Sequence, residues 1–145
     1  MLKGLDPLLT PELLMHLSAM GHGEWVAVVD ANFTADFLGK GKALVRLPGH
    51  SLERVSKAVL SVFPLAEDVA SPAAYMQVCN SPQGYKTPAQ TSIVELLARE
   101  GLPAGRVEAV ERFAFYEKIK GASVIVQSGE ATAYGNAMFC KGVIL

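Results

Sequence analysis

The chain has 145 residues, with 13 Lys+Arg against 14 Asp+Glu, and is 50% hydrophobic and 19% charged. This balance excludes intrinsic disorder, which combines low hydrophobicity with high net charge. The formal net charge of −1 argues against a nucleic-acid binder that depends on bulk positive charge. Because domains cluster near about 100–150 residues, we expect residues 1–145 to form a single domain.

Cysteine placement argues against a zinc site, and the first residues of the chain argue against a secreted protein. Cys79 and Cys140 lie far apart and belong to no CxxC or Cys/His spacing. Asp6 and Pro7 stand where a signal peptide would place its apolar core. The longest uncharged stretch, 69–85, is interrupted by prolines and amides, so it does not form an apolar membrane helix. We therefore expect a cytoplasmic protein with reduced thiols.

Helical and strand patterns alternate along the chain. The first helix is predicted after Thr10 as N-cap, with Pro11 at the first helical position and Gly21 as a C′ glycine. The apolar run 25–29, ended by Asp30, predicts a buried, parallel strand. Further strands are predicted over 43–47, 74–79, 107–110, 122–126 and 138–145, and further helices over 52–63, 88–100 and 112–120. This alternation indicates a three-layer α/β domain with a mostly parallel or mixed sheet flanked by helices.

His22 is the first candidate site residue. It lies between Gly21 and Gly23, which leave the backbone free to approach a ligand, and an imidazole can exchange a proton near neutral pH. The alternative is an exposed residue beside the end of the first helix. His16 and His50 are interpreted as structural.

Three further places carry polar or aromatic candidates. Asp30 follows an apolar strand, where open α/β sheets bind ligands, although it could equally cap the next turn. Arg112, Phe115 and Tyr116 share one face of a predicted helix and form either a sugar-pocket wall or core packing. The segment Tyr134–Asn136 offers a phenol and an amide, or is a hairpin turn with a positive-φ glycine.

Several well-known signatures are absent from the sequence. It contains no GxGxxG, Walker A, GxSxG or HExxH motif, and its three His and two Cys follow no ligand spacing. We therefore expect neither a nucleotide cofactor nor a metal. The residues themselves indicate a polar site for a small hydroxylated molecule.

Six motifs occur in order: Leu9-Thr10-Pro11-Glu12-Leu13-Leu14, Met20-Gly21-His22-Gly23, Asp30-Ala31-Asn32-Phe33, Arg112-Phe113-Ala114-Phe115-Tyr116-Glu117, Tyr134-Gly135-Asn136 and Lys141-Gly142-Val143. With these motifs the chain resembles the L-fucose mutarotase and D-ribose pyranase superfamily. The Arg112–Glu117 stretch favours the fucose mutarotase branch. The chain departs from that branch at Asn32 and Thr34, where those mutarotases carry His and Pro.

The resemblance implies an isomerase, without a cofactor, that interconverts the anomers of a monosaccharide such as L-fucose. It also implies a ring-shaped homo-oligomer, often of ten subunits. It implies that His22 is the proton donor and that the sugar is bound by Asp30, Arg112, Tyr134, Gly135 and Asn136. Two alternatives stay open: a non-catalytic sugar-binding or transport-accessory protein, and a D-ribose pyranase.

The predicted strand 25–29 separates His22 from Asp30 along the chain. Eight residue steps span roughly 26 Å if fully extended, so one straight strand cannot bring both side chains to one monosaccharide. Either the glycines fold His22 back, or His22 of one subunit faces Asp30, Arg112 and Tyr134 of its neighbour. We expect the second arrangement.

Overall fold

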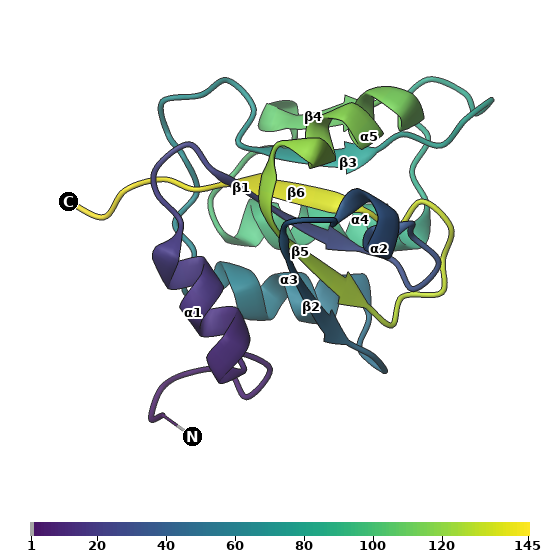
Figure 1. Cartoon of the computed structure of the whole chain (residues 1–145). Helices are drawn as coiled ribbons and strands as arrows, with labels where there is room; N and C mark the ends of the chain where they lie inside the picture. The colour runs from purple at the N-terminus through teal and green to yellow at the C-terminus, as the bar shows by residue number, and fades with distance from the viewer. Residues whose placement is uncertain (1) are drawn as a thin grey trace.

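The computed structural model describes residues 2–145 (Figure 1). Its elements in chain order are α1 (Pro11–Ala19), β1 (Trp25–Val29), α2 (Ala35–Leu38), β2 (Ala43–Leu47), α3 (Leu52–Leu60), β3 (Ala73–Met76), α4 (Pro88–Arg99), the 3₁₀ turn η1 (Ala104–Arg106), β4 (Val107–Val110), α5 (Arg112–Lys120), β5 (Ala122–Ser128) and β6 (Ala137–Cys140). Within residues 2–145, no helix has both the length and the apolar character needed to cross a membrane.

The strands form one mixed sheet in the order β2-β5-β1-β6-β3-β4. The central strand β1 pairs in parallel with β5 and antiparallel with β6. On the outer sides, β2 pairs in parallel with β5, and β3 pairs in parallel with β4 and antiparallel with β6. The predicted mixed sheet is therefore confirmed, and the parallel pairing predicted for 25–29 is right on its β5 side only.

Helices cover both faces of this sheet, as Figure 1 shows. Val26 and Val28 pack into one core cluster together with apolar residues of α1, α3 and α4. Ala27 and Val29 point the other way, into a second cluster with α2 and α5. Alternate residues of β1 thus pack into two separate cores, one on each face of the sheet, which explains why the strand is apolar on both faces. The predicted three-layer α/β architecture is confirmed.

The predicted N-cap at Thr10 is present, and α3 and α4 also have side-chain caps. Thr10 Oγ1 accepts a hydrogen bond from the Leu13 amide at 3.2 Å, and Ser51 Oγ accepts one from the Arg54 amide at 3.2 Å. Thr87 caps α4 in a reciprocal capping box with a glutamine three residues later. Each cap gives a partner to an amide that the first helical turn leaves free.

The end of α1 differs from the prediction. Met20 already has extended backbone (φ −65°, ψ 138°), and Gly21 does not adopt the left-handed conformation expected of a C′ glycine. Gly23 adopts it instead, with φ 82°. The Lys141 ammonium donates to the carbonyls of Leu17 and Met20, so a distant cation completes this helix end.

Three predicted elements are shorter in the structure, and one helix was not predicted. The helix expected to reach 63 ends at Leu60, and the strands expected to reach 79 and 145 end at Met76 and Cys140. Beyond Met76 the chain turns through Asn80, whose φ of 54° is incompatible with a continued strand. The four-residue helix α2 has too few residues to show a periodic pattern.

Candidate active site

Asp30 and Asn136 are locked together at one end of the sheet. The antiparallel pairing of Val28 with Ala137 brings the end of β1 beside the start of β6. The Asp30 amide donates to Asn136 Oδ1 at 2.9 Å, and Asn136 Nδ2 donates to Asp30 Oδ2 at 3.0 Å. Asp30 Oδ1 also accepts from the Asn32 amide at 3.0 Å. The sheet therefore fixes the direction of both side chains.

The Asp30 residue is only 6% exposed. Burial raises its pKa above the ordinary value, and hydrogen bonds from the Asn32 amide and the Asn136 side chain oppose that rise. The Asp30 carboxylate is therefore a hydrogen-bond acceptor that its neighbours hold in one direction and that is partly shielded from water. Its hydrogen bond from the Asn32 amide also forms the turn that the sequence allowed as an alternative, so the turn interpretation is confirmed and ligand binding by Asp30 stays a prediction.

Tyr134 and Gly135 shape the neighbouring loop between β5 and β6. Tyr134, not the glycine, has the positive φ, 62°. A Cβ on Gly135 would lie 2.8 Å from Glu130 Cγ and 3.0 Å from the Thr132 carbonyl oxygen, so a larger residue would force the loop to move. The hairpin-turn alternative is wrong, because β5 and β6 both pair with β1 and not with each other. Gly135 is required for close packing.

Helix α5 supplies a cation and an aromatic ring to the same place. Arg112 Nε donates to the Tyr116 hydroxyl at 3.0 Å, and the guanidinium lies 5.6 Å from the Tyr116 ring centroid. Phe33 meets that ring edge-on with centroids 5.8 Å apart. Phe115 is fully buried in the core. The three residues predicted to share one face of this helix therefore have different surroundings. Arg112 and Tyr116 lie beside Phe33 at the candidate site, whereas Phe115 packs in the core.

The Tyr134 phenol lies close to a thiol. A side-chain hydrogen bond with Cys79 and partial desolvation raise the pKa of Tyr134. The phenol therefore stays protonated at neutral pH and can donate a hydrogen bond to a ligand. Cys79 was not among the predicted site residues, since a single cysteine in a loop gives no spacing signal.

These side chains surround a cavity of about 540 Å³. Its lining consists of Asp30, Asn32, Phe33, Thr34, Met76, Arg112, Tyr116, Ala133, Tyr134 and Asn136. A volume of this size is in the range of small-molecule sites, about 300–1,000 Å³. Carboxylate, amide, guanidinium and phenol groups converge on it and can match the hydroxyls of a polyol. The aromatic rings can pack against the apolar face of a sugar.

His22 lies outside this cavity. Its Nε2 is 2.9 Å from Asp68 Oδ1, and both side chains are exposed, at 44% and 62%. This hydrogen bond lowers the pKa of the Asp68 carboxyl. Sequence reasoning missed Asp68, because 46 residues separate it from His22 and only the fold brings the pair together. The pair borders a cavity of about 360 Å³ lined also by Leu65, Glu67, Gly142, Val143 and Leu145.

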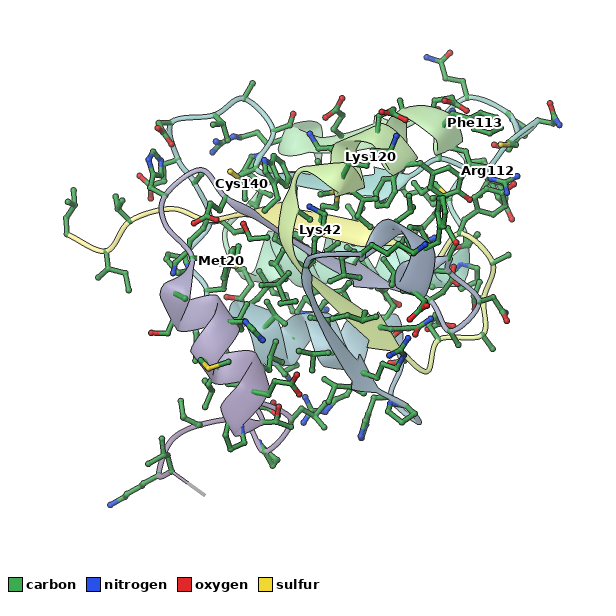
Figure 2. The ribbon with its side chains drawn as sticks, viewed as in Figure 1. Met20, Lys42, Arg112, Phe113, Lys120 and Cys140 are labelled. Atoms are coloured by element: carbon green, nitrogen blue, oxygen red, sulfur yellow. The ribbon has the colours of Figure 1, made fainter. Side chains whose placement is uncertain are left out.

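The two groups of residues occupy opposite ends of β1. Trp25 pairs with Cys140 at the His22 end, and Figure 2 shows Cys140 and Arg112 well apart along the sheet. Five strand residues at about 3.3 Å each span about 16 Å, and His22 and Asp30 lie beyond the two strand ends. Within one chain the structure brings together Asp30, Arg112, Tyr134 and Asn136, and leaves His22 apart.

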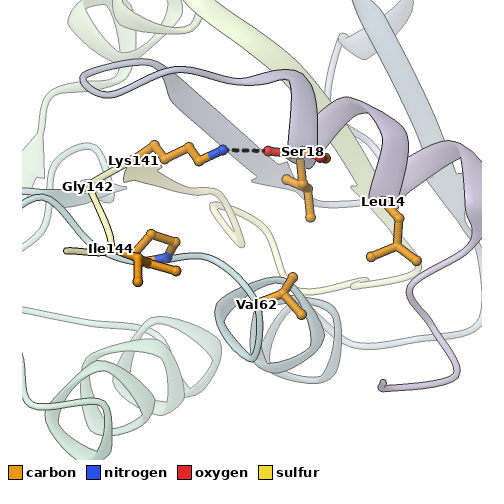
Figure 3. Close-up of a pocket in the computed structure, with 8 residues that line it drawn as sticks. Leu14, Ser18, Val62, Lys141, Gly142 and Ile144 are labelled. Carbon is orange, nitrogen blue, oxygen red and sulfur yellow. Dashed lines mark hydrogen bonds between the residues drawn. The ribbon is translucent and has the colours of Figure 1, made fainter. Parts of the chain in front are cut away.

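A further cavity of about 370 Å³ lies between α1 and the C-terminal segment (Figure 3). It is lined mainly by apolar side chains such as Leu14, Val62 and Ile144. Its cation, Lys141, is already bound to backbone carbonyls of α1. It therefore lacks the convergent free polar groups of the cavity beside Asp30. Among residues 2–145, no cluster of three or more His, Cys, Asp or Glu side chains could hold a metal ion.

The chain is similar to known proteins over nearly its whole length. The fucose mutarotase of Homo sapiens is 39% identical over 146 aligned residues, covering 99% of this chain and 94% of that protein. The L-fucose mutarotase of Glaesserella parasuis serovar 5 (strain SH0165) is 36% identical, with 99% and 96% covered. The crystal structure of the fucose mutarotase from Streptococcus pneumoniae in complex with L-fucose aligns with a TM-score of 0.87 and 28% identity, covering 99% of this chain and 100% of that chain.

The match to a family extends along nearly the whole sequence. Residues 3–144 fit the sequence model of the RbsD / FucU transport protein family. The resemblance predicted from six short motifs is thereby confirmed, and the chain belongs to the RbsD / FucU family.

Proposed function

We propose that this chain is an isomerase that interconverts the anomers of L-fucose, with residues 1–145 acting as one mutarotase domain. The observation that carries the proposal is the cavity beside Asp30, where a carboxylate, an amide, a guanidinium and a phenol converge. Relatives at 36–39% identity over nearly the full chain are fucose mutarotases, which supports the reaction and the sugar.

Mutarotation is a proton-transfer reaction. The cyclic hemiacetal opens when its ring oxygen gains a proton and its anomeric hydroxyl loses one, which leaves a free aldehyde. The open form then recloses from the other face, and the two protons return. A positioned acid or base contributes about 10²–10⁴-fold to such a step, and neither a nucleophile nor an electron carrier takes part. We therefore propose that no cofactor is used.

The roles follow from the side chains. Asp30, Arg112, Tyr134 and Asn136 bind the sugar hydroxyls, and Gly135 keeps the loop close enough for them to do so. The proton donor must release and regain a proton near neutral pH. Asp30 does not suit this role because its carboxyl is engaged in hydrogen bonds with its neighbours, and Tyr134 does not suit it because its raised pKa keeps the phenol protonated. His22 is the proposed acid. Protonated His22 donates one N–H to Asp68 and has the second N–H free for the ring oxygen.

We propose that the complete site forms between subunits of a homo-oligomer, a ring of ten by the family resemblance. Two exposed surfaces support this arrangement. Phe37 on α2 and Phe113 on α5 are each 66% exposed, and both helices begin at or directly after residues that line the sugar cavity, Thr34 and Arg112. Val143 and Leu145, 58% and 113% exposed, line the cavity beside His22. Contact between these surfaces would bury apolar area and bring His22 of one subunit to Asp30 of the next.

A cytoplasmic location is part of the proposal. Cys79 and Cys140 are free in the structure, as reducing conditions would leave them. The family resemblance to proteins acting on free monosaccharides is compatible with that compartment.

Saturation-transfer proton NMR of the anomeric signals tests the function. Micromolar protein should accelerate the exchange between the α and β signals of L-fucose and should act less on D-galactose and D-ribose. Acceleration of pyranose–furanose exchange in D-ribose alone would instead identify a pyranase. Line broadening from binding without any change in exchange rate would indicate a sugar-binding protein and would contradict the proposal.

A further inference from the structure

Gln90 is a fully buried polar residue outside the lining of the sugar cavity. It lies in the first turn of α4, and its side chain makes three hydrogen bonds. Oε1 accepts from the Thr87 amide at 2.9 Å. Nε2 donates to the Met76 carbonyl at 2.6 Å and to the Tyr134 carbonyl at 3.0 Å. One amide group therefore joins a helix start, a strand end and the loop that carries Tyr134.

Both carbonyls belong to segments that build the sugar site. Tyr134 has a positive φ of 62°, and its carbonyl also accepts from the Asn136 amide at 2.9 Å. The Met76 amide donates to the Asn136 carbonyl at 3.1 Å. A tyrosine in the left-handed region is strained, and such a conformation persists where the surroundings hold it in place. The Gln90 Nε2 group is the side-chain donor that holds this carbonyl.

The need for an amide distinguishes site positioning from helix capping. A capping box requires only a side-chain oxygen at this position, and glutamate supplies it as well as glutamine. The two N–H groups of the Gln90 side chain take no part in the cap, and they donate to the carbonyls of Met76 and Tyr134. Loss of the amide removes the Gln90 donor from the buried Met76 carbonyl and one of two donors from the Tyr134 carbonyl. Losing hydrogen bonds to buried carbonyls is costly, so this loss should displace the backbone around Tyr134.

We propose that Gln90 is a positioning residue of the sugar site, which sets Tyr134 and Asn136 from the far side of the sheet through their backbone. The inference rests on the proposed function for its kinetic consequence, but its structural consequence is independent of it. It predicts that the N–H groups of Gln90 matter for sugar binding and that the helix cap alone does not.

The test compares Gln90→Glu and Gln90→Met with a control, Thr87→Ala. Gln90→Glu keeps the oxygen for the cap and loses both donors, and Gln90→Met loses every hydrogen bond at nearly constant volume. Thr87→Ala removes the hydroxyl that caps α4 but retains the Gln90 amide. Each protein is measured for the KM and kcat of L-fucose anomer exchange, for its unfolding midpoint in urea, and for deuterium exchange of the peptide containing 134–136.

Both Gln90 variants should raise KM about 10-fold, the value of a hydrogen bond or two, with a smaller effect on kcat. They should also exchange deuterium faster at 134–136. Thr87→Ala should lower the unfolding midpoint and leave KM within about twofold. The inference is overturned if a folded Gln90→Glu or Gln90→Met protein has wild-type KM and wild-type exchange at 134–136. It is also overturned if Thr87→Ala raises KM equally.

The two hypotheses can fail separately. If wild-type protein does not accelerate anomer exchange, the proposed function fails, and deuterium exchange at 134–136 still tests whether Gln90 holds the loop. If wild-type protein is active and the Gln90 variants match it in both measurements, only the inference about Gln90 fails.

Discussion

The two ends of β1 are built in different ways. At the Asp30 end the polar groups are buried and hydrogen-bonded to each other, with Asn136 and Asp30 exchanging two bonds. At the His22 end the polar groups are exposed, and His22, which lies between two glycines, is hydrogen-bonded to the Asp68 side chain. One end is thus pre-organised within the chain, whereas the other, in the proposed arrangement, is half of a site that a second subunit completes.

This difference corresponds to two tasks. Groups that bind hydroxyls gain from a fixed direction, which buried hydrogen bonds provide. A group that exchanges protons needs access to the sugar and must change its charge, which burial in one chain would oppose. The proposed arrangement, with the acid on an exposed loop that closes against a neighbouring subunit, would satisfy both requirements.

The largest expected effect comes from His22→Ala. Loss of the proposed acid should lower the rate of L-fucose anomer exchange by about 10²–10⁴-fold. The fold should be retained, since the side chain is 44% exposed. His16→Ala, a histidine on α1 outside both cavities, is the matched control and should keep wild-type activity. Near-wild-type exchange by His22→Ala, measured by saturation-transfer NMR, would assign the acid to another group.

Mixing two inactive variants tests whether the ends belong to different subunits. His22→Ala and Asp30→Ala proteins, mixed in equal amounts and allowed to exchange subunits, should regain about one quarter of wild-type activity. That is the share of interfaces in which random mixing pairs two intact residues. Native mass spectrometry establishes that exchange took place. Proven exchange without regained activity, or full activity in a monomeric variant, would place the whole site within one chain.

The sequence predicted the layers of the fold well, because its signals are local. The apolar run 25–29 and the cap at Thr10 each depend on a few neighbouring residues. Element ends were predicted less well where a distant group decides them. The end of α1 is one example, since its last carbonyls bind Lys141 more than 120 residues away.

The candidate site follows the same rule. Asp30, Arg112, Tyr134 and Asn136 were found from motifs and strand ends, and the structure gathers them around one cavity. Asp68 and Gln90 were missed, because each acts through a partner 44 or 46 residues away and neither lies in a recognisable motif. The direction of their side chains depends on packing between elements, which no local pattern encodes.

A smaller effect is expected from Asp68→Asn. The amide oxygen can still accept the His22 N–H, but the negative charge that stabilises the imidazolium is lost. Because exposed ion pairs are screened by water, we expect the exchange rate to fall only about two- to fivefold. Glu67→Gln, a neighbouring carboxylate of the same cavity, is the control and should have no effect. A loss as large as that of His22→Ala would mean that the subunit contact buries the pair.

The smallest expected effect is on stability and concerns Asp30. Burial raises the pKa of its carboxyl in the folded state above the unfolded value of about 3.9. The folded protein therefore binds this proton more tightly, and the resulting stabilisation is complete below about pH 4 and is lost as pH rises through the folded pKa. Asp30→Asn removes this titration. The free energy of unfolding of wild-type protein, measured in urea from pH 4 to 7, should thus fall relative to that of Asp30→Asn by about 1.4 kcal/mol for each unit of raised pKa.

The exposed carboxyl of Asp36 offers a control, since Asp36→Asn should show a pH dependence parallel to wild type. A wild-type curve that rises relative to Asp30→Asn with increasing pH would mean that hydrogen bonds, not burial, dominate at this end of β1.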